Sequence, residues 1–426
     1  MKKISFCTNT AKNEIEHIKL LFRSFQENLS TNDHEILVFV DSDNQGTFEW
    51  LMTQKRAFPN LKVLRNHLPI PYGYQRNINE LFAQASNEIV SYVQSDMVVC
   101  KNYDLELLSR IEPGMVLCST RIEPPLHGNS GEKITYDFGL DPNQFNLEAF
   151  TSYAESQKQD TLTNFFFAPF TMYRDVWMSI GGHDTQFRRS REDSDVLTRL
   201  ILNNTKIVQT WSALVYHFTC TSSRGPNWFN SQNKEAQERA QMQQVADNIE
   251  MSRFFKKWGT FTHDTTKVKH FNIVANVLGG TLELQKFVNF ETFFDKIFVE
   301  DPTIIPVVQE YYDRTHSVAN KLLNVSEEDW AQYGYMFNSL VASDRIKPLQ
   351  ESVGDVIVEF NLNQVDISYV YEFIAKLQDI IGEVEDVGSF EYGPFKLTIN
   401  KLQDRAIELI EVTNPEIKPE HLYTIH

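Results

Sequence analysis

Residues 35–43 have the sequence EILVFVDSD, and residues 88–96 have the sequence EIVSYVQSD. Each is an apolar run of strand length that ends abruptly in carboxylates. Around them the chain alternates apolar runs with amphipathic stretches, which is typical of a largely parallel, doubly wound α/β sheet. Ligands of such sheets bind beyond the carboxyl ends of the strands, so the sequence predicts that these aspartates face a ligand.

The same rhythm extends over the first 260 residues. Strands are expected at residues 4–7, 35–43, 61–65, 88–96 and 206–209, with one more approaching His217. Helices are expected at residues 15–25, 48–56, 75–85, 193–202 and 233–258. The pattern is less regular between residues 113 and 163, where prolines, glycines and polar residues are frequent.

The length of the chain, 426 residues, predicts more than one domain. Beyond about residue 265 the sequence becomes rich in phenylalanine and acidic residues, and a β-α-β pattern follows over residues 356–399. We therefore expect an α/β domain over residues 1–262 and a C-terminal α+β accessory region over residues 263–426.

Composition limits the possible partners. Hydrophobic residues make up 42% of the chain, enough for a substantial core, and the formal net charge is −17. This charge disfavours broad electrostatic binding to nucleic acid or anionic membranes, although a local basic groove stays compatible with it. The four cysteines show no metal-binding spacing, and no signal peptide or membrane-spanning apolar run is present. We expect a cytoplasmic protein without a transmembrane segment.

Two strand ends carry candidate binding residues. Asp41 and Asp43 could accept hydrogen bonds from a base or a ribose hydroxyl, but aspartate also favours ordinary turns. The carboxylate oxygens of Asp96 are hard ligands, which suit a divalent cation bound to a diphosphate. The alternative is that Asp96, too, simply belongs to a turn.

Two later stretches complete the set. Glu192 and Asp193 lie where a helix is expected to begin, so they are candidates either for a helix cap or for a general base. Asp195 and Arg199 have the spacing of a helical ion pair. His217 ends an apolar strand and is either a packed core residue or a metal ligand.

The order and spacing of these sites resemble the family-two glycosyltransferases of the GT-A fold, over roughly residues 1–260. Six stretches carry the resemblance. They are ISFCTNTAKNEIEHI at 4–18, VDSD at 40–43, GYQRNINELFAQA at 73–85, YVQSDM at 92–97, SIGGHDTQF at 179–187 followed by REDSD at 191–195, and VYHF at 215–218. No single stretch is decisive, but six in the family's order make a specific match.

The resemblance implies a metal-assisted, inverting transferase that moves a sugar from a nucleotide-diphosphate sugar, with a UDP-sugar favoured, to an acceptor hydroxyl. Asp193 would be the general base, and Glu192 would orient the acceptor. Asp96 and His217 would bind Mn²⁺ or Mg²⁺. Eight further residues would bind the donor, and they are Thr8, Asn13, Asp41, Asp43, Arg76, Gln94, Ser95 and Arg224.

Two features qualify this assignment. Gln94 stands where the family's metal motif has its first acidic residue, so this position brings no charge, while Asp96 keeps the position that usually touches metal. Residues 219–230 combine a Gly-Pro step, small hydroxyls and Arg224, which suits a loop closing over a diphosphate as well as an ordinary surface loop.

Other functions stay open at this point. A non-catalytic binding or scaffold protein could use the same fold, with the C-terminal region as its working surface. The acceptor could be a glycan, a protein or, as in some virus-encoded enzymes, a modified DNA base approached by the patch Arg188, Arg189 and Arg191. A nucleotidyltransferase is disfavoured because the N-terminal region lacks a Gly-rich phosphate loop. A homo-oligomer is compatible with the sequence.

Overall fold

The computed structural model describes most of the chain. The described residues are 2–128, 130–188, 190–219, 234–258, 272–291, 294–321, 326, 328–329, 346–365, 376, 380, 386–401 and 423–426. Contacts divide the chain into two compact units, each described by itself below. The first comprises Met1–Arg188, Arg199–Glu238 and Glu411–His426, and the second comprises Arg189–Thr198 and Arg239–Ile410.

The first unit is built on one large sheet with the strand order β17-β3-β2-β1-β4-β9-β6-β10-β5. Six of these strands point in the same direction. They are β3 (Leu61–Asn66), β2 (Glu35–Val40), β1 (Ile4–Thr10), β4 (Ile89–Tyr92), β6 (Met115–Glu123) and β10 (Lys206–His217). The antiparallel strand β9 (Phe170–Tyr173) lies between β4 and β6. The predicted architecture, a mixed and mainly parallel sheet with helices beside it and a further C-terminal sheet region, is confirmed.

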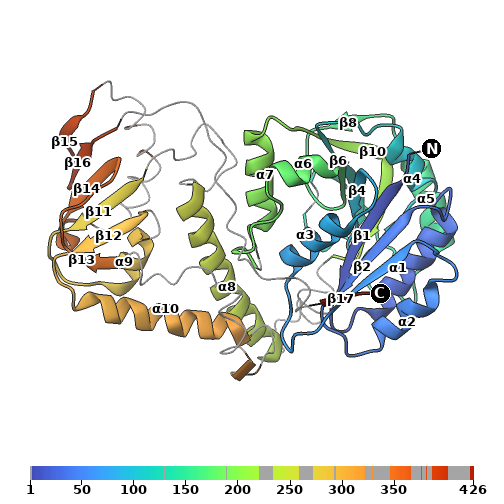
Figure 1. Ribbon diagram of the computed structural model, residues 1–426, viewed down its shortest axis with the longest axis horizontal. Coiled ribbons are helices and arrows are strands. Elements are labelled where there is room, and N and C mark those ends of the chain that lie inside the picture. Colours follow the sequence, from blue (N-terminus) through green and yellow to red (C-terminus); the bar gives the residue numbers. More distant parts are fainter. Residues whose placement is uncertain are drawn as a thin grey trace. The chain divides into compact units, whose positions relative to one another are not determined.

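Helices cover both faces of this sheet. Helices α1 (Ile15–Asn28) and α2 (Thr47–Gln54) lie on one side, and α3 (Tyr74–Gln84) and α6 (Arg174–Ser179) lie on the other (Figure 1). The chain moves outward from β1 to β2 and β3, and then returns to place β4 on the other side of β1. This reversal is a topological switch point, where the loops after β1 and β4 diverge and leave room for a ligand.

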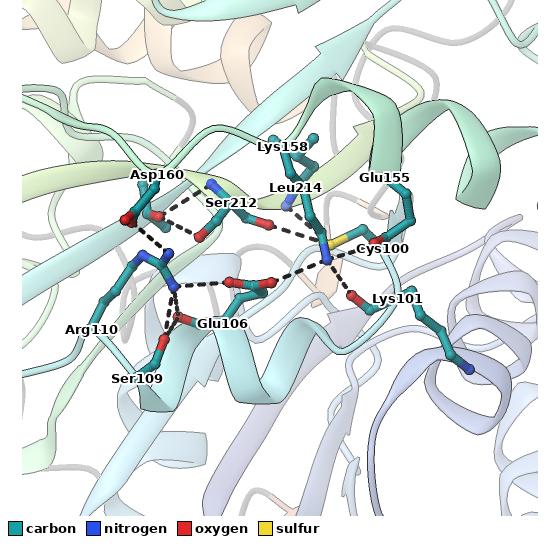
Figure 2. A network of polar contacts seen from close by, with 11 residues as sticks. Cys100, Lys101, Glu106, Ser109, Arg110, Glu155, Lys158, Asp160, Ser212 and Leu214 are labelled. Atoms are coloured by element: carbon teal, nitrogen blue, oxygen red, sulfur yellow. Dashed lines mark hydrogen bonds and ion pairs between the residues drawn. The ribbon is translucent and has the colours of Figure 1, made fainter.

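Strand β10 shows how the sheet positions its last histidine. The sequence predicts two strands here, whereas the structure has one strand with a register shift between Thr210 and Leu214. Cys100, just after β5 (Met97–Val99), holds the shift in place: its amide donates to the Leu214 carbonyl at 2.9 Å, and its sulfur accepts from the Leu214 amide at 3.3 Å (Figure 2). Bulges of this kind bend a strand and re-aim the residues that follow.

A network of polar contacts between α4, Lys158 and the residues around Cys100 supports this bulge (Figure 2). Glu106 on α4 (Tyr103–Leu108) accepts from Arg110 at 2.9 Å and from Lys158 at 3.2 Å. Lys158 also donates to the carbonyl of Lys101 at 2.8 Å, next to Cys100. Burial raises the pKa of the Cys100 thiol to about 12, so this sulfur acts as a packed structural group rather than as a nucleophile.

Residues 113–163, whose pattern is irregular, contain more regular structure than expected. They hold the nine-residue strand β6 of the first sheet, the short strands β7 (Lys133–Thr135) and β8 (Leu162–Thr163), and α5 (Leu147–Gln157). The β6 sequence MVLCSTRIE is almost wholly buried. It carries the same signal as the opening strands, an apolar run that ends in a carboxylate.

The last strand, β17 (Tyr423–Ile425), returns to the first sheet and pairs antiparallel with β3. Tyr423 is buried, and its hydroxyl donates to Glu80 of α3 at 2.6 Å. The ring of Tyr423 packs edge-on against Phe39 of β2. The end of the chain thus contributes to the first unit, although the sequence places it within the region after residue 263.

The second unit holds a separate six-stranded sheet with the order β13-β12-β11-β14-β16-β15. Its strands are β13 (Ile346–Pro348), β12 (Lys296–Val299), β11 (Ile273–Val277), β14 (Val356–Phe360), β16 (Phe395–Ile399) and β15 (Gly388–Tyr392). The first four are parallel, and β15 and β16 form an antiparallel hairpin. Helices α9 (Leu284–Glu291) and α10 (Ile304–Lys321) contribute to its apolar core.

Two elements extend beyond these sheets. Helix α7 (Glu192–Leu202) begins in the second unit and ends in the first. Helix α8 (Lys234–Trp258) begins in the first unit and ends in the second. The helix expected in the middle of the β-α-β pattern of residues 356–399 falls largely outside the described residues. Among the described residues, no helix combines the length and the apolar character that a membrane crossing needs.

Candidate active site

Asp96 and His217 meet at the end of the first sheet. Asp96 immediately precedes β5, and His217 is the last residue of β10, which pairs with β5 so that His217 faces Met97. The Phe218 amide donates to the Asp96 carbonyl at 3.1 Å. Nε2 of His217 lies 3.8 Å from Oδ2 of Asp96, although the two residues are far apart in the sequence. The strand ladder brings this predicted pair together.

Glu123, the last residue of β6, holds the other nitrogen of the imidazole. Its Oε1 lies 2.8 Å from Nδ1 of His217, and its carboxylate also contacts Lys133 at 2.9 Å and Arg121 at 3.2 Å. Burial alone would raise the pKa of Glu123, but the hydrogen bond with His217 and the two cations hold it well below its usual range. Glu123 is therefore an ionised carboxylate at the edge of the site.

The Asp96–His217 pair fits a divalent cation. The separation of 3.8 Å is too long for a hydrogen bond, but two ligands about 2.1 Å from one cation lie about 3 to 4 Å apart. The described residues contain no group of three or more His, Cys, Asp or Glu side chains that could hold a metal by themselves. Two protein ligands suit Mg²⁺ or Mn²⁺ that completes its coordination with substrate phosphates and water.

A second carboxylate, Glu14, joins the loops at the switch point. Its Oε2 accepts from the Ala11 amide at 3.0 Å, in the turn after β1, and from the Ser95 hydroxyl at 2.9 Å, in the turn after β4. Burial raises the pKa of Glu14 to about 7, and the charge of Asp96 adds to this effect, while the two hydrogen bonds oppose it. Glu14 ties Ser95 in place one residue before Asp96.

Asp41, the aspartate directly after β2, is buried and makes internal hydrogen bonds. Its carboxylate accepts from the main-chain amides of Tyr72 and Gly73, the latter at 3.0 Å. It also accepts from Nδ2 of Asn66 at 2.9 Å and from Nδ2 of Asn77 at 3.1 Å. Burial raises its pKa against these four hydrogen bonds. Asp41 thus fixes the turn before α3, and any contact with a nucleotide base would compete with these bonds.

Asp43 lies in the turn before α2 and accepts hydrogen bonds from the first two amides of the helix. Its carboxylate accepts from the amides of Gln45 and Thr47 at 3.0 Å and of Phe48 at 2.9 Å. Partial burial raises its pKa, but the backbone hydrogen bonds outweigh burial and lower it. Asn13, in the left-handed region at φ 66°, exchanges hydrogen bonds with Asn44 and so joins the loops after β1 and β2.

Helix α3 organises the glycine-containing loop at residues 181–187. Asn79 accepts from the His183 amide at 2.8 Å and donates to the His183 carbonyl at 2.9 Å. Gly182 has φ 70°, and a Cβ there would lie 2.4 Å from Oδ1 of Asn79, so the position requires glycine. Arg76 is buried on the same helix and donates to the Thr185 hydroxyl at 3.2 Å. Burial lowers the pKa of its guanidinium.

Two side-chain oxygens of the predicted donor-binding set are buried and have no hydrogen-bond partner among the described residues. They are Oγ1 of Thr8, near the end of β1, and Oε1 of Gln94, two residues before Asp96. Buried polar groups are nearly always paired in folded proteins, so such atoms are typical of surfaces that receive a ligand. Both residues belong to the predicted donor-binding set. The loop that contains Arg224 lies outside the described residues, as does Arg189.

The predicted base lies in the second unit. Glu192 and Asp193 are half-buried in the first turn of α7. Asp195, in the same turn, is fully buried and accepts from Nε1 of Trp258 at 2.9 Å, and its Oδ1 lies 2.7 Å from Nζ of Lys257. Asp195 therefore serves packing, and Glu192 and Asp193 are the acidic residues of this turn that stay partly accessible.

Glu14, Glu123 and His17 are site residues that the sequence interpretation did not identify. Glu123 had a usable signal, since it ends an apolar strand just as Asp41 does. Glu14 and His17 had none, because their proximity to Asp96 arises from the packing of α1 against β5, which follows Asp96. Burial lowers the pKa of the His17 imidazole, while the charge of Asp96 raises it.

Comparisons with known proteins find distant structural matches. No family model and no curated protein matches the sequence. Among solved structures, TarS 1–349 from S. aureus is 13% identical, with 60% of this chain and 80% of that chain covered and a TM-score of 0.39. The mannosyltransferase PcManGT from Pyrobaculum calidifontis, solved with GDP-Man and Mn²⁺, is 14% identical, with 58% and 64% covered and a TM-score of 0.38.

A third structure, GalNAc-T7 with UDP, GalNAc and Mn²⁺, is 13% identical, with 60% of this chain and 50% of that chain covered and a TM-score of 0.40. At this level of similarity, the three structures leave the donor, the acceptor and the site residues of this chain undefined.

Proposed function

We propose that this protein is a glycosyltransferase that moves a sugar from a nucleotide-diphosphate sugar, with a UDP-sugar favoured, to an acceptor hydroxyl with inversion. One observation carries the proposal: Nε2 of His217, at the carboxyl end of β10, lies 3.8 Å from the carboxylate of Asp96, which lies in the turn between β4 and β5. An acidic and an imidazole ligand at this place in a doubly wound sheet suit a cation on a diphosphate.

Residues of this chain would divide the work as follows. Asp96 and His217 would hold Mn²⁺ or Mg²⁺, whose charge, when bound, offsets the charge that grows on the departing diphosphate. The acceptor oxygen attacks the anomeric carbon while the bond from that carbon to the diphosphate oxygen breaks, and the electron pair leaves with the nucleoside diphosphate. Asp193 takes the proton of the acceptor hydroxyl, with Glu192 orienting the acceptor.

The donor residues named from the resemblance that the structure describes fall into two groups. Thr8, Gln94 and Ser95 lie at the ends of β1 and β4, where a diphosphate beside Asp96 would be found. The second group is engaged in internal hydrogen bonds, so we propose that it acts chiefly by fixing the turns that face the donor; it consists of Asn13, Asp41, Asp43 and Arg76.

The decisive experiment measures release of nucleoside diphosphate from a panel of nucleotide sugars with Mn²⁺. Asp193→Asn should lower turnover at least about 100-fold, because the carboxamide cannot accept the proton, while the thermal unfolding midpoint stays unchanged. Ser194→Ala, in the same helical turn, is the matched control and should stay within about twofold.

Two results would contradict parts of the proposal. Unchanged turnover in Asp193→Asn would remove Asp193 from the mechanism but leave glycosyl transfer standing. If the wild-type protein releases nucleotide from no sugar donor, and calorimetry with nucleoside diphosphates and Mn²⁺ detects no binding, the chain is better described as a scaffold on this fold.

A further inference from the structure

Glu123 has no part in the chemistry proposed above, yet its surroundings are specific. It ends β6, its side chain is 5% exposed, and the same carboxylate contacts an imidazole and two cations. The parallel pairing of β7 with β6 places Lys133 opposite Arg121, so both cations come from neighbouring strands. A buried charge requires such partners: Lys133 contacts Oε2 of Glu123, and Arg121 and His217 both contact Oε1.

The hydrogen bond between Glu123 and His217 determines which ring nitrogen carries the hydrogen. The Glu123 carboxylate lies against two cations, Arg121 and Lys133, so it accepts the hydrogen bond of 2.8 Å and Nδ1 of His217 donates it. In a neutral imidazole Nε2 then has its lone pair available. Nε2 is also the atom that faces Asp96.

We infer that Glu123 is a positioning residue, which holds His217 in the tautomer and the ring orientation in which Nε2 binds the divalent cation beside Asp96. The inference rests on the proposed function. Carboxylates that accept from the distal nitrogen of a metal-binding histidine fix its orientation and make it a stronger ligand. Lys133 and Arg121 complete the arrangement by compensating the charge of Glu123.

The competing description is a structural ion chain, in which a protonated His217 bridges Asp96 and Glu123 and no metal binds. The two descriptions differ in the state of Nε2. It has no hydrogen if Glu123 is a positioning residue, and it carries one if His217 is a structural cation. They also differ in the effect of Glu123 on metal affinity.

The first test titrates the full-length protein with Mn²⁺ alone, and again with UDP present, and follows free Mn²⁺ by electron paramagnetic resonance. Glu123→Ala should weaken Mn²⁺ binding about 10- to 100-fold. Glu123→Gln should lose less, because its amide oxygen can still accept from Nδ1. Glu112→Ala is the matched control: it removes an exposed carboxylate just before β6 that pairs with Lys206 rather than with His217, and its affinity should stay within about threefold of the wild type.

The second test has a readout independent of metal and activity. Nitrogen-15 NMR of histidine-labelled protein at pH 8, with His217→Gln used for assignment, should show a hydrogen on Nδ1 and none on Nε2 of His217. In Glu123→Ala this preference should be lost. Circular dichroism and the thermal unfolding midpoint establish that each variant is folded.

The outcomes separate the inference from the function it rests on. A folded Glu123→Ala variant that binds Mn²⁺ as tightly as the wild type overturns the role of Glu123 and leaves the metal site intact. A hydrogen on Nε2 in the wild-type protein overturns it as well. If the wild-type protein takes up no Mn²⁺, with or without UDP, both the metal site and the inference fail, while sugar transfer is still decided by the Asp193→Asn experiment.

Discussion

Two strands of the first unit end in almost the same way and lead to different structures. The stretch after β2 delivers Asp41, and the stretch after β4 delivers Asp96. Asp41 accepts four hydrogen bonds from residues of the following segment, whereas Asp96 faces the imidazole of His217 from the far end of the sheet. A carboxylate at a strand end can thus either stabilise a turn through hydrogen bonds or face a binding site, and the neighbouring groups determine which of the two it does.

The largest expected effect compares Asp41→Ala with Asp96→Ala. Loss of Asp41 leaves two main-chain amides and two side-chain amides without their acceptor, which should lower the free energy of unfolding by about 3 to 5 kcal/mol. Asp96→Ala should change it by less than about 1 kcal/mol while lowering transferase turnover at least about 100-fold. Urea unfolding and the nucleotide-release assay measure the two effects. Equal losses of stability in both variants would break the comparison.

The second prediction concerns Glu14, which binds Ser95 next to Asp96, and the dependence of protein stability on pH. Its folded pKa of about 7 lies above the ordinary value of 4.5, so the folded state favours the protonated form. The stability this proton provides is complete below pH 4.5 and is lost as pH rises through 7, a difference of about 3 kcal/mol. Glu14→Gln should therefore unfold like the wild type near pH 4.5 and be more stable by about that amount at pH 8.

Denaturant unfolding at the two pH values checks this expectation. Gln keeps an oxygen that can accept from the Ala11 amide and the Ser95 hydroxyl, so it is a conservative replacement. A stability difference between Glu14→Gln and the wild type that does not change with pH would show that the carboxylate is already well solvated in the folded protein.

The smallest expected effect concerns Asp43, which follows β2 two residues after Asp41. Asp43→Ala removes the acceptor for the first amides of α2 and should lower the free energy of unfolding by about 1 kcal/mol. Ser42→Ala, at the neighbouring position, is the control and should stay within about 0.5 kcal/mol. If Asp43 also contacts the donor, the KM for the nucleotide sugar will rise at least about tenfold; an unchanged KM would limit it to capping.

The sequence predicted most elements of the first unit because buried strands and amphipathic helices have distinct hydrophobic periods. It missed β6, since prolines and polar residues nearby obscured a strand that carries Glu123. It also divided β10, because the residues of the bulge that Cys100 holds interrupt the apolar pattern. The division of the chain at residue 263 and the roles of the site residues stay predictions.

The sequence by itself determined that a doubly wound sheet forms and that carboxylates follow several of its strands, because hydrophobic period and local turn chemistry are properties of neighbouring residues. Only the tertiary structure decided that Asp41 fastens a turn, that Glu123 reaches His217, and that the chain's last strand completes the first sheet. These depend on partners between about 30 and 360 positions away, and their pairing follows from strand order and register, which local sequence does not encode.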